Sequence, residues 1–239
     1  MKWQDKEVLH LVLMKDPFER IMNGKNLKKE NINALKKGLS NLERHILNIK
    51  KFGLKPIVAI NHFILDSTKE INAVLNFCEN MKVEVSECKH WAQGGKGAID
   101  LAKKVVKVCK NKKESKFKYL YKNNIGLLEK INLITKQIYK ADKITFNDEV
   151  EKKLKFFEDN GYGRLPVCIA KTQYSFSTNP KLKGAPSNHE IPIREVRLSS
   201  GAEFIVVVCG SIMTMPGLPK KPAANSIILN KKGEVEGLF

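Results

Sequence analysis

The sequence is poor in arginine, although it is strongly basic. Only five of its 43 basic residues are Arg, while the formal net charge is +18 and the pI is about 9.6. Guanidinium is the group usually used for bidentate contacts to phosphate or guanine, and the lysines are instead scattered along the whole chain. The charge therefore indicates an AT-rich coding bias as readily as a binding face, and nucleic acid is not the partner we expect.

The sequence also lacks any cysteine pattern that would define a disulfide framework or a zinc site. Its cysteines are odd in number and form neither a CxxC pair nor a Cys/His metal spacing. The apolar run at residues 8–14 is too short to cross a membrane, and no signal-peptide cleavage pattern follows it. These absences predict a soluble, cytoplasmic protein with no metal ion of its own.

The first part of the chain alternates helical and strand patterns. Apolar residues recur at three- and four-residue spacing over 26–51, which predicts an amphipathic helix. Short apolar strands are expected at 56–60 and 83–85, with helices at 66–81 and 98–110. This order predicts a parallel, right-handed α/β unit.

The second part becomes rich in strands. Helices are expected at 117–139 and 148–160, and the chain then shows strand patterns at 166–170, 191–198, 203–209 and 227–229. We therefore predict an α/β fold, in which a parallel-strand α/β domain over residues 1–145 precedes a smaller β-rich α+β domain over residues 146–239.

Two aromatic residues each follow a predicted parallel strand of the first domain. Phe63 and Trp91 would both lie at the carboxyl edge of the sheet, where open α/β sheets bind ligands. A flat heteroaromatic ligand could stack between two such rings. The alternative is that both side chains pack in the core or under a loop.

Polar residues beside these aromatics could contact a ligand. Asn61 follows a buried strand, and Gly94, Gly95 and Lys96 lie where a loop opens a helix, so they could receive an anion. The glycines lack Walker A spacing and could equally form a tight turn. Asp66 is a candidate helix N-cap as much as a ligand contact.

Lys171 follows the predicted strand at 166–170. A lysine at the end of a buried strand costs free energy unless an anionic group pairs with it. It could contact an anionic substrate, or it could form a salt bridge that holds the two domains together.

Several strings of residues, from about Leu27 to the end of the chain, resemble the C-terminal part of formate–tetrahydrofolate ligase. They are Trp91-Ala-Gln-Gly-Gly, Lys171-Thr-Gln-Tyr-Ser and Met213-Thr-Met-Pro-Gly-Leu-Pro. The family pattern Asn-Lys-Phe-Pro-Thr-Asp-Thr is met here by Asn61 and Phe63, but His62 replaces its Lys. The resemblance implies that Phe63 and Trp91 sandwich the pterin ring of tetrahydrofolate.

The resemblance also implies a reaction in which formate, ATP and tetrahydrofolate give 10-formyltetrahydrofolate, ADP and phosphate. The sequence has no phosphate loop, so ATP and Mg²⁺ are expected only with a separately encoded N-terminal ligase domain. The alternatives are a folate-binding fragment without catalysis and a truncated remnant. The family further implies a homo-oligomer.

Overall fold

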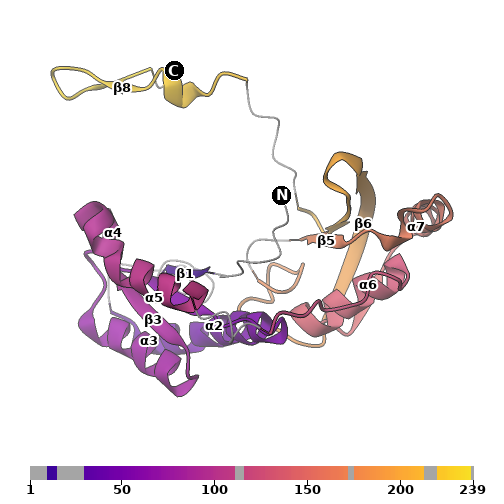
Figure 1. Ribbon diagram of the computed structural model, residues 1–239, viewed down its shortest axis with the longest axis horizontal. Helices are drawn as coiled ribbons and strands as arrows, with labels where there is room; N and C mark the ends of the chain where they lie inside the picture. Colours follow the sequence, from indigo (N-terminus) through magenta and orange to yellow (C-terminus); the bar gives the residue numbers. More distant parts are fainter. Residues whose placement is uncertain (1–9, 15–29, 111–115, 172–174, 213–219, 238–239) are drawn as a thin grey trace.

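The computed structural model describes residues 10–14, 30–110, 116–171, 175–212 and 220–237 (Figure 1). Two motif segments, 172–174 and 213–219, lie outside these described residues. Within the described ranges, no helix combines the length and apolar character needed to span a bilayer. Helices and two main sheets confirm the predicted α/β fold class.

A parallel sheet of three strands forms the first part of the structure. Its order is β1 (His10–Met14), β2 (Ile57–Asn61) and β3 (Glu84–Cys88), with β2 in the middle. β2 is buried along its whole length, as a continuous β-branched run predicts for a strand covered on both faces. The two predicted strands are confirmed, and β1 adds a third.

Helices α2 (Ile32–Lys51) and α3 (Thr68–Asn80) cover one face of this sheet. The apolar stripe predicted for α2 is buried against β2 and α3 in a core that includes Leu35, Leu39, Leu42, Ile46, Val58, Ile60, Ile71 and Val74. α2 begins at Ile32 rather than at residue 26, because the Asn31 side chain accepts a hydrogen bond from the Ala34 N–H and so caps the helix.

The start of α3 is fixed by a capping box. Ser67 Oγ accepts from the Glu70 N–H at 3.2 Å, and Glu70 Oε2 accepts from the Ser67 N–H at 3.1 Å. Glu70 Oε1 also accepts from the Asn31 N–H at 2.9 Å. One buried carboxylate therefore satisfies backbone donors at the starts of both helices.

Helix α5 (Ile99–Lys110) lies on the opposite face of the sheet. Val58 faces the core with α2 and α3, so strand alternation turns Ser86, which is in register with Ala59, to the other side. There Ser86 Oγ donates to Asp100 Oδ2 at 2.6 Å. The predicted helix is confirmed, but none of its residues is buried: Ile99 is 49% exposed and Val106 is 48% exposed.

A second sheet of four strands forms the other main part. Its order is β4 (Lys143–Thr145), β6 (Glu190–Ser199), β7 (Phe204–Cys209) and β5 (Val167–Ala170). β6 and β7 are antiparallel, whereas β4 and β5 pair in parallel at the two edges. Helices α6 (Leu127–Ile134) and α7 (Asp148–Asp159) pack against this sheet. α7 and strands β5, β6 and β7 confirm the predicted elements.

The predicted helix over 117–139 is wrong in its first half. Residues 116–126 contain no helix, and α6 begins only at Leu127, after the N-cap Gly126. Asn123, Asn124 and Gly126 disfavour helix in this segment. Tertiary contacts also hold the segment in another conformation: the Lys118 N–H donates to the Phe52 carbonyl at 2.9 Å, and the Phe52 and Phe117 rings stack with centroids 6.4 Å apart.

The core of the second sheet draws on residues before the predicted boundary at 145. Leu127, Ile131 and Ala141 are buried together with Val150 and Leu154. The division of the chain at residue 145 stays a prediction. A separate hairpin of β8 (Ile228–Leu229) and β9 (Val235–Glu236) ends the described chain and stands apart from both sheets in Figure 1.

The polar face of α2 joins the two parts. Asn48 Nδ2 donates to the Ile138 carbonyl at 3.0 Å, and Asn41 Nδ2 donates to the Gly184 carbonyl at 3.0 Å. The Arg44 guanidinium reaches the carbonyls of Tyr139, Ala185 and Pro186. One helix therefore buries its apolar stripe in the first core and satisfies backbone carbonyls of the second part.

We expect Ser67→Ala to lower the free energy of unfolding by about 1 kcal/mol, because the variant loses the N-cap bond of α3. Urea denaturation followed by circular dichroism measures this change. Ser40→Ala, which removes an exposed hydroxyl bonded only to the local Lys37 carbonyl, is the control and should change stability by less than about 0.5 kcal/mol. Equal effects of the two substitutions would contradict the capping role.

Candidate functional site at the carboxyl edge of the parallel sheet

The carboxyl ends of β2 and β3 lie side by side. The two strands pair in parallel with Asn61 opposite Cys88, and the His62 N–H continues the ladder by donating to the Cys88 carbonyl at 3.0 Å. The loops that leave the two strands therefore start from neighbouring positions at one edge. This is the edge at which open α/β sheets bind ligands.

Phe63 lies in a tight turn after β2. Asp66 Oδ2 accepts from the Phe63 N–H at 2.8 Å, and the Asp66 N–H donates to the Phe63 carbonyl at 3.0 Å. Asp66 thus closes the turn, while Ser67 is the N-cap of α3. Phe63 is half-buried, and the next two side chains, Ile64 and Leu65, are exposed.

Trp91 lies in the loop after β3. It belongs to the one-turn helix α4 (His90–Gln93), which runs into a 3₁₀ helix at Gly94–Ala98. Trp91 is 63% exposed, so the alternative that it packs in the core is wrong. A large aromatic side chain in this position is available to a ligand.

A close backbone contact closes the loop that carries Trp91. The Lys89 N–H donates to the Gly97 carbonyl at 3.0 Å. A Cβ atom at Gly97 would clash with the Lys89 carbonyl and would lie 2.6 Å from the His90 nitrogen. Only glycine allows this approach without a backbone shift.

Gly94, Gly95 and Lys96 are exposed on the same loop. The glycines begin the five-residue 3₁₀ helix, and α5 starts only at Ile99, so they do not open an α-helix directly. Gly94 has φ of +55° with ψ of −142°, a conformation that requires glycine. The turn is thus a structural feature of the loop, and contact with an anion stays a prediction for these three residues.

Asn61 is buried at the end of β2. Only 7% of its surface is exposed, and its Oδ1 has no hydrogen-bond partner among the residues that the structure describes. Strand alternation places its side chain on the face of the sheet that carries α5. A buried acceptor of this kind calls for a donor from water, a ligand or another part of a larger protein.

A charged cluster links the two loops at the sheet edge. His62 Nδ1 and Lys89 Nζ both lie close to Glu87 Oε1, at 2.5 Å and 2.9 Å. Partial burial acts to raise the pKa of Glu87, but the hydrogen bonds from Lys89 and His62 outweigh it and hold the pKa below its usual value. Sequence reasoning missed this cluster, because the signal is only a Glu one residue before the end of a strand.

Lys171 lies in the second sheet, at the end of β5, and not at the edge that carries Phe63 and Trp91. Its ammonium donates to the Ser175 carbonyl and lies 5.1 Å from the centroid of the Tyr139 ring and 6.0 Å from that of Phe176. Burial lowers the pKa of Lys171 to about 8. Burial also lowers the pKa of His45, with further contributions from the charges of Lys171 and Arg44.

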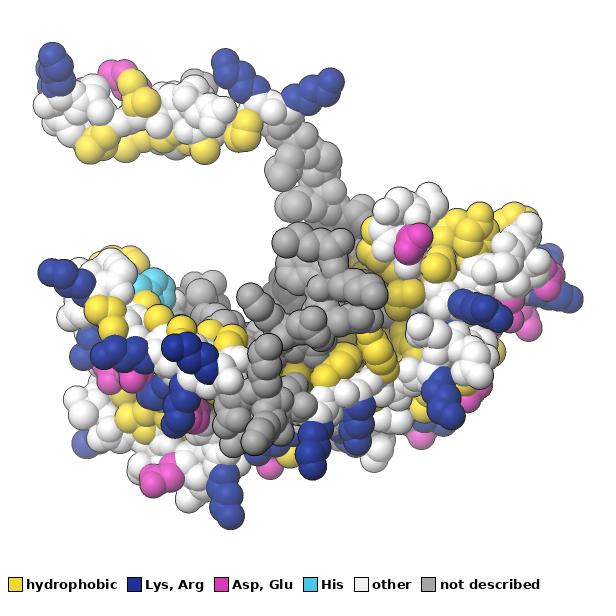
Figure 2. Space-filling model, viewed as in Figure 1, with side chains coloured by type: hydrophobic (Ala, Val, Ile, Leu, Met, Phe, Trp, Pro, Cys, Tyr) yellow, Lys and Arg dark blue, Asp and Glu magenta, His cyan; other side chains and the backbone are white. Residues whose placement is uncertain are grey.

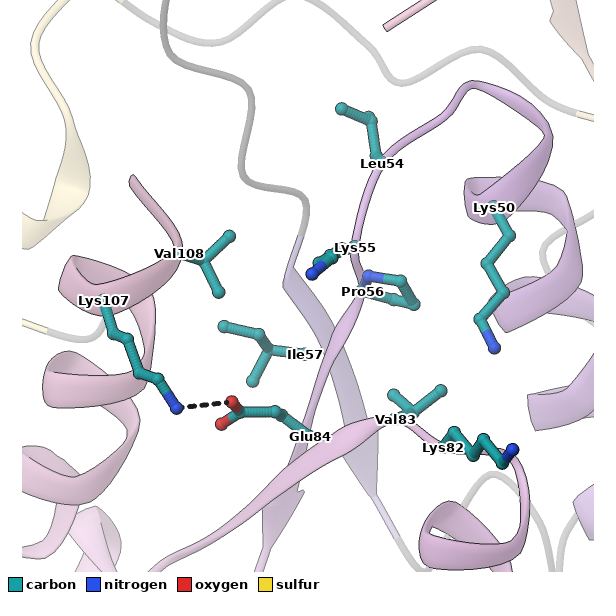
Figure 3. Close-up of a pocket in the computed structure, with 10 residues that line it drawn as sticks. All are labelled: Lys50, Leu54, Lys55, Pro56, Ile57, Lys82, Val83, Glu84, Lys107 and Val108. Atoms are coloured by element: carbon teal, nitrogen blue, oxygen red, sulfur yellow. Dashed lines mark hydrogen bonds and ion pairs between the residues drawn. The ribbon is translucent and has the colours of Figure 1, made fainter. Parts of the chain in front are cut away.

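A cavity of about 420 Å³ lies at the other edge of the parallel sheet. It is lined by the first residues of β2 and β3, Ile57 and Glu84, and by four lysines from neighbouring segments, Lys50, Lys55, Lys82 and Lys107 (Figure 3). Lys107 is paired with Glu84 at 3.3 Å, and Lys50 Nζ donates to the Met81 carbonyl at 2.9 Å. Two of its cationic groups therefore already have protein partners, and the cavity is separate from the predicted folate site.

The surface shows where charge and potential metal ligands lie. Lys and Arg side chains are dispersed over the face seen in Figure 2 and are interspersed with other side chains. Across the described ranges, His, Cys, Asp and Glu form no group of three or more that could hold a metal ion.

Comparison with known proteins relates this chain to one family. A family model described as formate–tetrahydrofolate ligase matches residues 13–239. A formate–tetrahydrofolate ligase of Pelagibacter ubique is 58% identical over 214 residues, which cover 90% of this chain and 38% of that relative. The ligase of Roseobacter denitrificans is 51% identical over 210 residues, which cover 88% of this chain and 38% of that relative. The chain thus spans well under half the length of these relatives.

We expect Gly97→Ala to destabilise the loop that carries Trp91, because the added methyl group meets the backbone of Lys89 and His90. Unfolding free energy should fall by about 1–3 kcal/mol. Gly95→Ala is the matched control, since a Cβ atom there meets nothing within 4 Å. Thermal and urea unfolding compare the two variants, and equal stability would contradict the steric argument.

We expect the stabilising contribution of Lys171 to rise with pH. Its folded-state pKa of about 8 lies below the ordinary 10.5, so between these values the unfolded chain binds a proton that the folded chain does not. The free energy of unfolding of the parent, relative to Lys171→Met, should therefore increase by roughly 2 kcal/mol between pH 8 and pH 10. Urea titrations at both pH values measure the difference, with exposed Lys110→Met as the control. A difference that is flat or falls with pH would refute the shift.

Proposed function

Because the chain belongs to the formate–tetrahydrofolate ligase family, we propose that it supplies the tetrahydrofolate site for formylation at N10. The reaction of the complete enzyme would join formate to tetrahydrofolate at the expense of ATP and release ADP and phosphate. The chain spans 38% of the length of the relatives compared. For this chain we therefore propose the binding of tetrahydrofolate, which accepts the formyl group.

One observation carries the proposal: the parallel pairing of β2 with β3 brings the loops of Phe63 and Trp91 to one sheet edge. Trp91 is exposed, and Phe63 is held in a turn closed by Asp66. A pterin is flat and apolar on its faces and polar on its edge, so two aromatic side chains can stack on it while polar groups bind its rim. We assign Phe63 and Trp91 to these stacking contacts.

Polar groups near the two aromatics suit the remainder of a folate. Asn61 Oδ1, which has no hydrogen-bond partner within the described ranges, could accept a hydrogen bond from an N–H group of the ligand after a local rearrangement, since the atom is buried. Gly94, Gly95 and Lys96 are exposed and could receive an anionic group such as a folate carboxylate or a phosphate. Lys171 follows β5 in the second sheet, so it could contact a substrate only if part of that substrate reached the second sheet.

ATP and Mg²⁺ do not fit the residues present. The sequence has no Gly-x-x-x-x-Gly-Lys-Ser/Thr loop, and the described residues provide no acidic cluster suited to a divalent ion. We assign both to an N-terminal ligase domain, the portion of the ligase that this chain does not span. The apolar stripe of α5, with Ile99 and Val106 half-exposed, is a surface that such a partner could cover.

A second candidate is a folate-binding fragment without catalysis. The missing phosphate loop favours it, because phosphoryl transfer without a cradle and a metal ion has no electrostatic stabilisation of its transition state. Both candidates bind tetrahydrofolate, and they differ only in whether a partner restores ligase activity.

All five cysteines are free thiols, which favours a reducing compartment, and we place the chain in the cytoplasm.

We expect Trp91→Ala to weaken tetrahydrofolate binding by about 1–3 kcal/mol, a loss of roughly fivefold to 150-fold in affinity, because one stacking partner is removed. Isothermal titration calorimetry under reducing conditions measures the dissociation constant. Tyr119→Ala is the control: Tyr119 is 66% exposed, close to the 63% of Trp91, but it lies near the other edge of the sheet. Unchanged affinity in Trp91→Ala would reject the stacking role.

A further inference from the structure

We propose that Glu87 is a positioning residue that holds the loops of Phe63 and Trp91 at a fixed separation through His62 and Lys89. The inference deepens the proposed function and rests on it, because the separation matters only if a ring binds between the two loops. Glu87 itself need not contact the ligand.

The geometry of the cluster carries the proposal. Glu87 Oε1 lies 2.5 Å from His62 Nδ1 and 2.9 Å from Lys89 Nζ. A carboxylate only accepts hydrogen bonds, so the His62 Nδ1 atom carries the proton of the first contact. A single oxygen atom thus binds one group from each loop.

The two partners of Glu87 lie close in the chain to the aromatic residues of the two loops. His62 immediately precedes Phe63, and Lys89 is the N-cap residue of α4, which contains Trp91. A change in the position of either partner would therefore move the start of a loop. This coupling is direct because His62 is next to Phe63 in the chain and a single residue separates Lys89 from Trp91.

Each loop is also closed within itself, and these internal contacts do not set the distance between the loops. Asp66 closes the Phe63 turn, and the bond between Lys89 and Gly97 closes the Trp91 loop. The backbone bond from His62 to Cys88 fixes the two strands but not the side chains beyond them. Glu87 joins one closed loop to the other through its contacts with His62 and Lys89.

The side chains of the cluster are partly shielded from solvent. The side chains of His62 and Glu87 are 23% and 30% exposed, while that of Lys89 is 47% exposed. Hydrogen bonds that are partly shielded from water are stronger than those on an open surface. The hydrogen bond between His62 and Glu87 should therefore contribute more than the more exposed contact with Lys89.

Substitutions of His62 test its contact with the Glu87 carboxylate. A lysine at this position can also donate to the Glu87 carboxylate, so His62→Lys should keep the link between the loops. His62→Ala should break it.

The test uses the full chain with Trp3→Phe, which leaves Trp91 as the only tryptophan. Acrylamide quenching of Trp91 fluorescence without ligand reports on the loop, and calorimetry measures tetrahydrofolate affinity. We expect Glu87→Gln to change the quenching constant and to weaken affinity about fivefold, the loss expected for a partly shielded ion pair. Glu84→Gln, which breaks the pair with Lys107 at the other end of the same strand, is the matched control and should change neither.

The coupling is tested by a double-mutant cycle. His62→Ala should resemble Glu87→Gln in both measurements, His62→Lys should resemble the parent, and the double variant should be no weaker than either single variant. Parental quenching and affinity in Glu87→Gln, or losses that simply add in the double variant, would overturn the positioning role. If the parent itself binds no tetrahydrofolate, the proposed function fails, and unchanged Trp91 quenching in Glu87→Gln would separately refute the link between the loops.

Discussion

The parallel pairing of β2 with β3 is the constraint on which the candidate site depends. Parallel strands end at the same edge of a sheet, and the register of Asn61 with Cys88 makes these two strands end at the same level. Residues 28 positions apart in the sequence, Phe63 and Trp91, are thereby carried to neighbouring loops. Antiparallel pairing of the same two strands would send the loops to opposite edges.

Helix α2 makes this sheet part of a larger structure. Its apolar stripe fills the core against β2 and α3, and its polar side chains donate to carbonyls that precede β4 and β6. Buried carbonyls need such donors, because leaving them unpaired would cost more than a hydrogen bond gains. Near this joint, burial lowers the pKa of Lys171, so its charged form is held at a cost in stability.

The site combines closed loops with exposed and unpaired side-chain groups that a ligand could contact. The turn at Phe63 and the loop at Trp91 are both closed by hydrogen bonds, which limits the conformational entropy lost when a flat ligand binds. Trp91 nevertheless remains exposed, and the Asn61 acceptor lacks a described partner. Preformed loops with unsatisfied apolar and polar groups are expected of a binding site rather than of a core.

Sequence patterns predicted the regular elements better than the segments between them. The apolar spacing of α2, the buried run of β2 and the alternation in β6 each reflect a local period, so each could be identified from neighbouring residues. The helix expected at 117–126 failed because contacts with Phe52, far away in the sequence, hold that segment. Strand β4 is only three residues long and forms because β6 lies beside it.

By itself, the sequence determined the α/β class, the order of most helices and strands, and the resemblance that identified Phe63 and Trp91 as candidates. These features depend on residue type and local spacing. Only the tertiary structure decided that Trp91 is exposed, that Gly97 permits a backbone contact, that the Lys171 ammonium lies near the Tyr139 ring, and that Glu87 joins His62 to Lys89. Those facts depend on which residues, distant in the sequence, come close together in space, and local sequence patterns do not predict this.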